Sequence, residues 1–304
     1  MLNPAFSGTP IRQFRIKPKK GEPMRIRTIV AAFTTAAALF ASASLGQADD
    51  LTDRAKAGKP IRIGFAHEIP WAYPGDKNEP LGFANALALG VLKSMGYTNI
   101  EPVVTDWGGL IPGLQAGRFD IITGGMYITG KRCANVSFAE PMGKFGDSFI
   151  VKKGNPKGIH TYQDIKKNDA TMATVSGFVN VDAALKEGIA EDKIMQVPGL
   201  TEVLAAVKAG RADAGAGNDF AMKDLAKSAP DEIEVTDSAA LPEWTFNWVA
   251  IAFRPEDKDF LKAYNEAQAK YLGTPEMLEA VGKFQYTKAQ LPGDAKTDWI
   301  CANR

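Results

Sequence analysis

The sequence predicts an α/β protein made of two lobes that are joined by two crossings of the chain. Strand-like and helix-like segments alternate, and the alternation begins again after about residue 168. The motif Ala-Gly-Arg-x-Asp occurs at 116–120 and again at 209–213, each time between a helix pattern and a strand pattern. A pairing of Cys133 with Cys301 would return the end of the chain to the first lobe.

The elements of the first lobe follow the order expected for parallel strands joined by helices. An alternating strand pattern at 61–65 leads into a loop that contains Pro70 and Pro74. Helical spacing of apolar residues then continues to Gly96. The next predicted elements are a strand within 100–107, a short helix within 110–117 and a strand within 120–125.

The second lobe repeats this order, and two β-prone runs connect it to the first. The predicted elements are a strand within 169–178, a helix within 179–188, a strand within 193–199, a helix within 200–210 and a strand within 212–218. The runs at 148–156 and 245–257 are the predicted crossings, and two helices follow the second run. We expect one lobe at 49–151 and 249–304 and the other at 152–248, with a ligand cleft between them.

The first 48 residues are predicted to be an upstream extension and a signal peptide. Arg25 and Arg27 precede an alanine-rich apolar run that ends in small residues at Ala48. Residues 1–23 precede a second candidate start at Met24. We expect a periplasmic mature chain that starts near Asp49; a membrane anchor is the alternative interpretation.

Composition and charge exclude several classes of protein. The 304 residues are 45% hydrophobic and 23% charged, which is typical of a packed globular protein. Residues 1–48 carry seven basic residues and one acidic residue, and removing their net charge of +6 from the chain's +1 leaves −5. We therefore expect no nucleic-acid partner.

The cysteines and histidines indicate a disulfide rather than a metal or redox site. The two cysteines form an even pair that an exported protein can oxidise, although two separate thiols are the alternative. The chain has only two histidines and no Cys-x-x-Cys motif. We therefore expect no metal and no cofactor.

Several segments resemble the periplasmic solute-binding proteins of polar amino-acid-type ABC importers. They are "IRIGFAHEIPWAY", "WGGLIPGLQAGRFDIITGGMYITGKRCANVSFAEPM", "SFIVKKGNP" and "VKAGRADAGAGND", within about residues 59–290. Within that family the chain is most similar to the ectoine- and hydroxyectoine-binding proteins, which share the Glu-x-Pro-aromatic turn, the Arg-Cys pair and a late cysteine. The resemblance implies a type II periplasmic binding protein fold, α/β and two-lobed with two hinge crossings. Such a protein closes on a zwitterionic solute and delivers it to ABC permease subunits in the membrane.

Arg132 is the predicted carboxylate clamp. It follows the strand within 120–125, at the edge where an α/β sheet presents its ligand crevice. A guanidinium can hold a carboxylate with two parallel hydrogen bonds, and the family resemblance assigns this role to the arginine of the motif. A surface arginine is the alternative.

Three aromatic residues and one acid are predicted to surround the cationic part of the solute. Trp71, Trp107 and Tyr127 each follow a predicted strand, and aromatic faces attract cations. Their positions match the aromatic pocket of ectoine-binding proteins, and Glu68 matches a carboxylate that pairs with N–H groups of the solute. The alternatives are core packing for the aromatic residues and an exposed loop position for Glu68.

The second lobe is predicted to contribute a turn and an amide. Ser176, Gly177 and Phe178 lie between a strand and a helix, where backbone N–H groups favour an anion. Phe178 could instead extend the aromatic wall. Asn218 occupies the position at which α-amino-acid binders commonly carry an aspartate for the primary ammonium; a one-residue slip would place Asp219 there. A neutral amide pairs poorly with a buried ammonium, so Asn218 favours a solute whose positive charge is spread or shielded.

These observations together predict a binding protein and not an enzyme. Ectoine or hydroxyectoine is the first expected ligand; a polar or basic amino acid or a betaine is the alternative. A periplasmic dehydratase on the same fold would need a general acid or base, for which Glu68 is the only obvious candidate. A sensor module is a further alternative, and we expect the protein to be a monomer.

Overall fold

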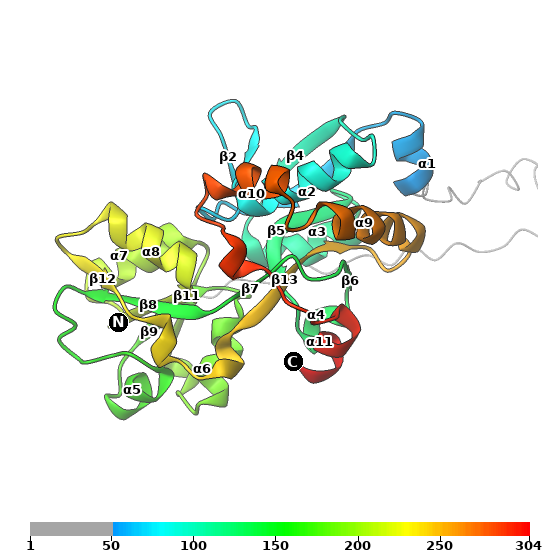
Figure 1. The fold of residues 1–304 in the computed structure, drawn as a ribbon. Helices are drawn as coiled ribbons and strands as arrows, with labels where there is room; N and C mark the ends of the chain where they lie inside the picture. The colour runs from blue at the N-terminus through cyan, green and yellow to red at the C-terminus, as the bar shows by residue number, and fades with distance from the viewer. Residues whose placement is uncertain (1–50) are drawn as a thin grey trace, which may run out of the picture. The chain divides into compact units, whose positions relative to one another are not determined.

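The computed structural model describes residues 51–304, so the extension and signal peptide predicted for residues 1–48 lie outside the described residues. The described part of the chain contains two β-sheets, each with its own helices, and a short hairpin (Figure 1). Among residues 51–304, no helix has the length and apolar character that a membrane span requires.

The first sheet has the strand order β4-β1-β5-β13-β6, and β7 also pairs with β13. Strands β4, β1 and β5 are parallel, whereas β13 runs antiparallel to β5. The strands are β1 (Ile61–Phe65), β4 (Ile100–Val104), β5 (Ile121–Tyr127), β6 (Ser137–Phe138), β7 (Gly143–Phe145) and β13 (Asn247–Phe253). The helices of this lobe are α1 (Leu51–Lys56), α2 (Phe83–Ser94), α3 (Leu110–Gln115), α4 (Gly130–Cys133), α9 (Lys258–Tyr271), α10 (Pro275–Gly282) and α11 (Thr297–Asn303). The hairpin strands are β2 (Tyr73–Pro74) and β3 (Pro80–Leu81).

The second sheet repeats this arrangement with the order β10-β9-β11-β8-β12. Again three strands are parallel, and the strand beside them, β8, runs antiparallel to β11. The strands are β8 (Asp147–Lys152), β9 (Met172–Val175), β10 (Ile194–Val197), β11 (Ala214–Asn218) and β12 (Ile233–Val235). The helices are α5 (Tyr162–Lys167), α6 (Val179–Lys186), α7 (Leu200–Lys208) and α8 (Asp219–Ser228). The predicted strand–helix order of both lobes is confirmed.

The two crossings lie slightly earlier in the chain than we expected. Strand β8 pairs with β11 and β12, so the first change of sheet falls at Gly146 and not after Val151. Strand β13 pairs with β5 from Val249 and with β7 from Asn247, so the return precedes Asn247 instead of following Trp248. The expected boundaries failed because a β-prone run shows where a strand is but not with which sheet it pairs.

The repeated Ala-Gly-Arg-x-Asp motif makes the same connection in both lobes. Gly117 and Gly210 end their helices with φ of 66° and 71°, a left-handed conformation that glycine adopts without strain. The carboxylate of Asp120 then accepts the backbone N–H of Arg62 at 2.9 Å, and that of Asp213 accepts the N–H of Thr171 at 2.9 Å. The motif therefore attaches each helix–strand turn to the neighbouring strand.

Asp120 is the more deeply buried of these two aspartates. Its side chain is 0% exposed and accepts hydrogen bonds from Arg54 and Arg62, each at 2.7 Å. Burial alone would raise its pKa, but the hydrogen bonds from the two guanidinium groups and the backbone lower the pKa to about 2. This carboxylate is thus ionised at neutral pH and holds α1 and β1 together.

Candidate ligand site

A small pocket, largely filled by its own side chains, lies between the edges of the two sheets. Seven of the nine predicted ligand residues line it, and three further residues complete it. The lining consists of Glu68, Trp71, Trp107, Gly125, Tyr127, Arg132, Phe178, Val179, Asn180 and Asn218.

Arg132 reaches from the first lobe to the second. Thr129 caps the N-terminus of α4 by accepting the backbone N–H of Arg132 at 3.3 Å. The guanidinium donates to the carbonyl oxygen of Tyr127 at 2.8 Å and to that of Gly177 at 2.9 Å. Burial lowers its pKa to about 10, so it stays charged at neutral pH. Two bonds use only part of its five N–H donors, and the rest can bind an anion.

Glu68 places a buried carboxyl group in the same pocket. Its backbone exchanges hydrogen bonds with Ala72 at 2.8 and 2.9 Å, which fixes the turn that follows β1. The carboxyl group accepts a hydrogen bond from the amide of Asn218. Burial raises the pKa of Glu68 to about 8, although the hydrogen bond from Asn218 and the charge of Arg132 lower it in part.

Asn218 has a fixed orientation. It is the N-cap of α8, and its Oδ1 accepts the N–H of Ala221 at 2.8 Å and the indole N–H of Trp71 at 2.5 Å. Its Nδ2 therefore faces Glu68. Asp219 does not line the pocket, and its carboxylate pairs with Lys223 at 2.5 Å. The second lobe therefore presents the neutral amide of Asn218, and not the carboxylate of Asp219, to the pocket.

The aromatic residues both line the pocket and pack against other rings. Trp71 lies 4.5 Å from Phe145 and meets Tyr127 edge to face at 6.2 Å, measured between ring centroids. Trp107 meets Phe178 edge to face at 5.1 Å, and the guanidinium carbon of Arg132 lies 5.7 Å from the Trp107 ring. From the sequence, lining the pocket and packing in the core were alternative interpretations of these aromatic residues. In the structure the same side chains do both.

The turn of the second lobe differs from the expected anion site. The N–H of Ser176 donates to Val197 and that of Phe178 donates to Val175, so neither amide is available to a ligand. Gly177 turns its carbonyl oxygen toward Arg132 and Trp107, which donate to it at 2.9 and 3.3 Å. Ser176 and Gly177 are absent from the pocket lining. The sequence could not show this, because backbone direction depends on the φ of 83° at Gly177.

Comparison with known proteins agrees with this two-lobed, pocketed fold. Residues 61–285 match the family described as "Bacterial extracellular solute-binding proteins, family 3". The chain belongs to this family. Its members are solute-binding proteins. Among residues 51–304, no group of three or more His, Cys, Asp or Glu side chains could hold a metal ion.

Three relatives of this solute-binding protein bear on its ligand. A probable amino-acid ABC transporter periplasmic-binding protein of Sinorhizobium fredii is 33% identical over 283 residues, 90% of this chain and 93% of the relative. The crystal structure of EhuB in complex with hydroxyectoine has a TM-score of 0.76 and 28% identity and covers 84% of this chain and 99% of that one. An ancestral amino acid-binding protein, a precursor of cyclohexadienyl dehydratase, has a TM-score of 0.66 and 27% identity and covers 78% and 99%. The solute-binding protein therefore functions as a receptor of an amino-acid-type ABC importer.

Gly125, Val179 and Asn180 line the pocket of the solute-binding protein but were not predicted. Gly125 has φ of 76°, and a Cβ atom there would lie 2.7 Å from the Trp71 ring. The paired glycines of "GGMY" lie inside β5, and the second of them, Gly125, permits the close packing of Trp71. The pair of glycines in the sequence could have indicated that Gly125 lies close to the pocket. Nothing in the sequence marks Val179 or Asn180 as pocket residues.

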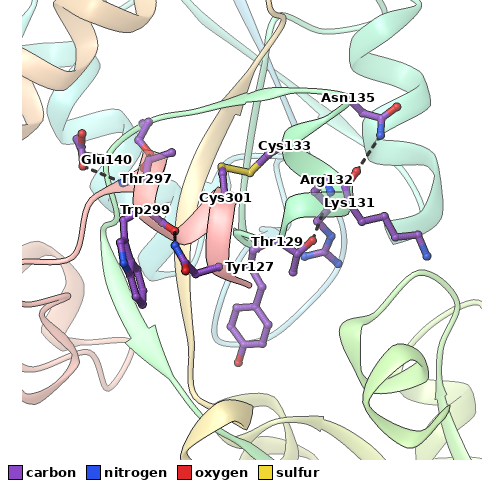
Figure 2. The surroundings of a disulfide bond; sticks show 12 residues. Tyr127, Thr129, Lys131, Arg132, Cys133, Asn135, Glu140, Thr297, Trp299 and Cys301 are labelled. Atoms are coloured by element: carbon purple, nitrogen blue, oxygen red, sulfur yellow. Dashed lines mark hydrogen bonds between the residues drawn. A yellow bond between two sulfur atoms is a disulfide. The ribbon is translucent and has the colours of Figure 1, made fainter. Parts of the chain in front are cut away.

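The predicted disulfide between Cys133 and Cys301 is confirmed. Figure 2 shows that it joins α11 to α4, with Arg132 beside Cys133, and the two Cα atoms are 5.8 Å apart. The backbone N–H of Gly130 also donates to the carbonyl oxygen of Arg304 at 2.8 Å. The helix that carries Arg132 is therefore held by the last residues of the chain.

Cys133→Ser is expected to lower the stability of the solute-binding protein more than its affinity. The disulfide closes a loop of 168 residues, and losing it should reduce the free energy of unfolding by about 2–4 kcal/mol. The clamp keeps its contacts with Tyr127 and Gly177, so the Kd should change less than about threefold. Calorimetric melting and titration measure both quantities. Cys301→Ser should cause the same loss, and the double variant should add nothing to it; a large loss of affinity at unchanged stability would contradict this prediction.

Proposed function

We propose that the pocket binds a zwitterionic compatible solute, with ectoine or hydroxyectoine as the first candidate. The observation that carries this proposal is that a buried guanidinium, a buried carboxyl group and four aromatic side chains line one small pocket. Arg132 would hold the carboxylate, and Glu68 would accept N–H groups of the cation. Trp71, Trp107 and Tyr127 would surround its delocalised charge.

The neutral amide of Asn218 supports a cation of spread charge. A primary ammonium loses its hydration when it is buried and needs an anionic partner. Asn218 has no charge to offer, and its oxygen already accepts from Trp71 and Ala221. The likeness to EhuB, which was solved with hydroxyectoine, agrees with this choice.

Contacts across the pocket suggest how the receptor would hold its solute. Arg132 and Trp107 of the first lobe meet Gly177 of the second, and Glu68 and Trp71 meet Asn218. Contact between the lobes excludes water, which strengthens each charged interaction inside. We propose that this form of an exported, monomeric protein is delivered to ABC permease subunits.

The second candidate ligand is a polar or basic amino acid, or a betaine. The relative from Sinorhizobium fredii, described as a probable amino-acid ABC transporter protein, supports it. A betaine has no N–H to give to Glu68, so it should bind more weakly than ectoine if the carboxyl group is used as proposed.

A calorimetric panel tests the proposal. The purified protein is titrated with ectoine, hydroxyectoine, glycine betaine, arginine and glutamine, and mass spectrometry identifies any co-purified solute. We expect the tightest binding for ectoine or hydroxyectoine. Tight binding of arginine or glutamine without any response to ectoine would contradict the proposal, and turnover of a prephenate-type substrate would favour a dehydratase instead.

A further inference from the structure

Behind the second-lobe wall of the pocket lies a buried row of three polar side chains. Asp147 begins β8, Tyr162 begins α5 and Asn180 is the second residue of α6. Each is only 1% exposed, and of the three only Asn180 lines the pocket. Asp147 lies directly opposite Asn218 in the β8–β11 ladder, at the edge of the sheet that faces the pocket.

The hydrogen bonds in this row have a defined direction. The Tyr162 hydroxyl donates to Oδ2 of Asp147 at 3.3 Å and accepts from Nδ2 of Asn180 at 2.9 Å. A tyrosine hydroxyl has one proton, and an ionised carboxylate can only accept. When Asp147 is ionised, the Tyr162 proton is therefore used by Asp147, and the tyrosine oxygen can only accept from Asn180.

This direction decides which end of the Asn180 amide is left for a ligand. Its NH₂ group must face Tyr162, so Oδ1 is the remaining polar atom of the side chain. Within residues 51–304, no hydrogen bond is donated to Oδ1 of Asn180. This oxygen is also not completely enclosed by protein atoms, so a ligand can reach it. The second lobe therefore offers an acceptor at this point.

We propose that Asp147 and Tyr162 are positioning residues that hold the oxygen of Asn180 toward the ligand, so that the pocket selects solutes with an N–H or O–H donor there. The inference rests on the proposed function in that it concerns the same pocket. A solute without such a donor would leave a buried acceptor unpaired, which is a strong basis for discrimination.

The burial of Asp147 fits this role. Its Oδ1 has no hydrogen-bond partner among the described residues, and an incompletely paired buried carboxylate destabilises a fold. A neutral side chain could hydrogen-bond to Tyr162 in either direction. An ionised carboxylate can only accept, so it fixes the direction of the bond from Tyr162 and, through it, of the bond from Asn180 to Tyr162.

Two substitutions with matched controls test the inference by affinity. Asp147→Asn removes the obligate acceptor, and Tyr162→Phe removes the hydroxyl that links it to Asn180. Asp213→Asn removes a carboxylate whose partners lie outside the pocket. Tyr264→Phe removes a buried hydroxyl of the first lobe that has no hydrogen-bond partner among residues 51–304. Burial raises the pKa of Asp147 to about 7, so titrations are made at pH 8.

Ectoine, hydroxyectoine, arginine and glutamine serve as probes, below the melting temperature of every variant. Asp147→Asn and Tyr162→Phe should weaken the tightest-binding probe by about tenfold, while each control changes its Kd less than about twofold. Unchanged Kd in Asp147→Asn and Tyr162→Phe would overturn the inference, even if these variants melt earlier.

Exchange of the Asn180 side-chain NH₂ protons with solvent provides a readout that needs no ligand. In the ligand-free protein, NMR should show slow exchange in the natural sequence and exchange at least about tenfold faster in Asp147→Asn. Equal exchange rates would overturn the inference. If none of the four probes binds, the proposed function is contradicted, and the exchange rates alone decide the role of Asp147.

Discussion

Arg132→Ala is expected to abolish solute binding. The guanidinium is the one cationic side chain among the residues that line the pocket, and it is 8% exposed. A solute carboxylate buried without it would lose its charged partner, which costs about 2–5 kcal/mol and corresponds to a Kd at least about thirtyfold weaker. Isothermal titration with the tightest-binding solute of the panel measures the change.

Two control variants separate loss of charge from loss of geometry. Arg132→Lys keeps a positive charge but cannot form two parallel bonds, so we expect an intermediate Kd. Arg118→Ala removes an exposed arginine on the turn before β5 and should leave binding unchanged. Normal binding by Arg132→Ala would place the carboxylate site elsewhere.

Solute affinity is expected to rise with pH up to about pH 8 and then level off. Burial raises the pKa of Glu68 to about 8, so the free protein holds this carboxyl group mostly neutral at pH 7. A cationic solute favours the ionised form, so binding releases a proton and Kd should fall by up to about tenfold per pH unit. Titration in buffers of different ionisation enthalpy counts that proton directly.

The stability of the free protein should change in the opposite direction. The pKa of Glu68 is about 8 in the folded chain against an ordinary value of 4.5, so between these values the folded state binds more protons than the unfolded state. The free energy of unfolding therefore falls as pH rises through this window, by up to about 1.4 kcal/mol per unit from this group.

Glu68→Gln assigns both effects to one side chain. Glutamine cannot ionise, so this variant should lose the Glu68 contribution to the decline in stability and should bind a cationic solute more weakly, with a flatter pH profile. Asp147, whose pKa burial raises to about 7, contributes to the slope that remains. Glu101→Gln, at an exposed position on β4, is the control and should match the natural sequence. A full pH dependence of affinity in Glu68→Gln would contradict the assignment.

The sequence was sufficient for the order of the elements because periodic apolar residues and helix-ending glycines are local signals. Strand β1, helix α2 and helix α7 all lie where the spacing of apolar residues predicts them. Helix α8 was not predicted, because its start is defined by Asn218, a residue that we interpreted as a ligand contact. The lobe boundaries also needed strand pairing, which no local pattern contains.

Site residues could be predicted where the type of side chain itself indicates a particular ligand group, such as a carboxylate or a cation. Arg132, Glu68 and the aromatic residues stand out in the sequence near the ends of predicted strands, and all of them line the pocket. Ser176 and Gly177 do not, because the Ser176 amide donates to Val197 and the Gly177 carbonyl oxygen accepts from Arg132, and neither bond leaves a trace in the sequence. Asn180 was missed because its orientation depends on Tyr162 and Asp147, which are distant in the chain.

The two places at which the chain changes sheets are not independent of each other. Strands β7 and β13 are hydrogen-bonded across 143–145 and 247–249, and a Cβ atom on Gly146 would lie 2.7 Å from the ring of Phe246. This ladder keeps the two strands side by side up to the crossings, so we expect both crossings to bend at neighbouring points of the chain. The distance between one probe on each lobe, both placed away from these points, should therefore differ between the empty and the loaded protein.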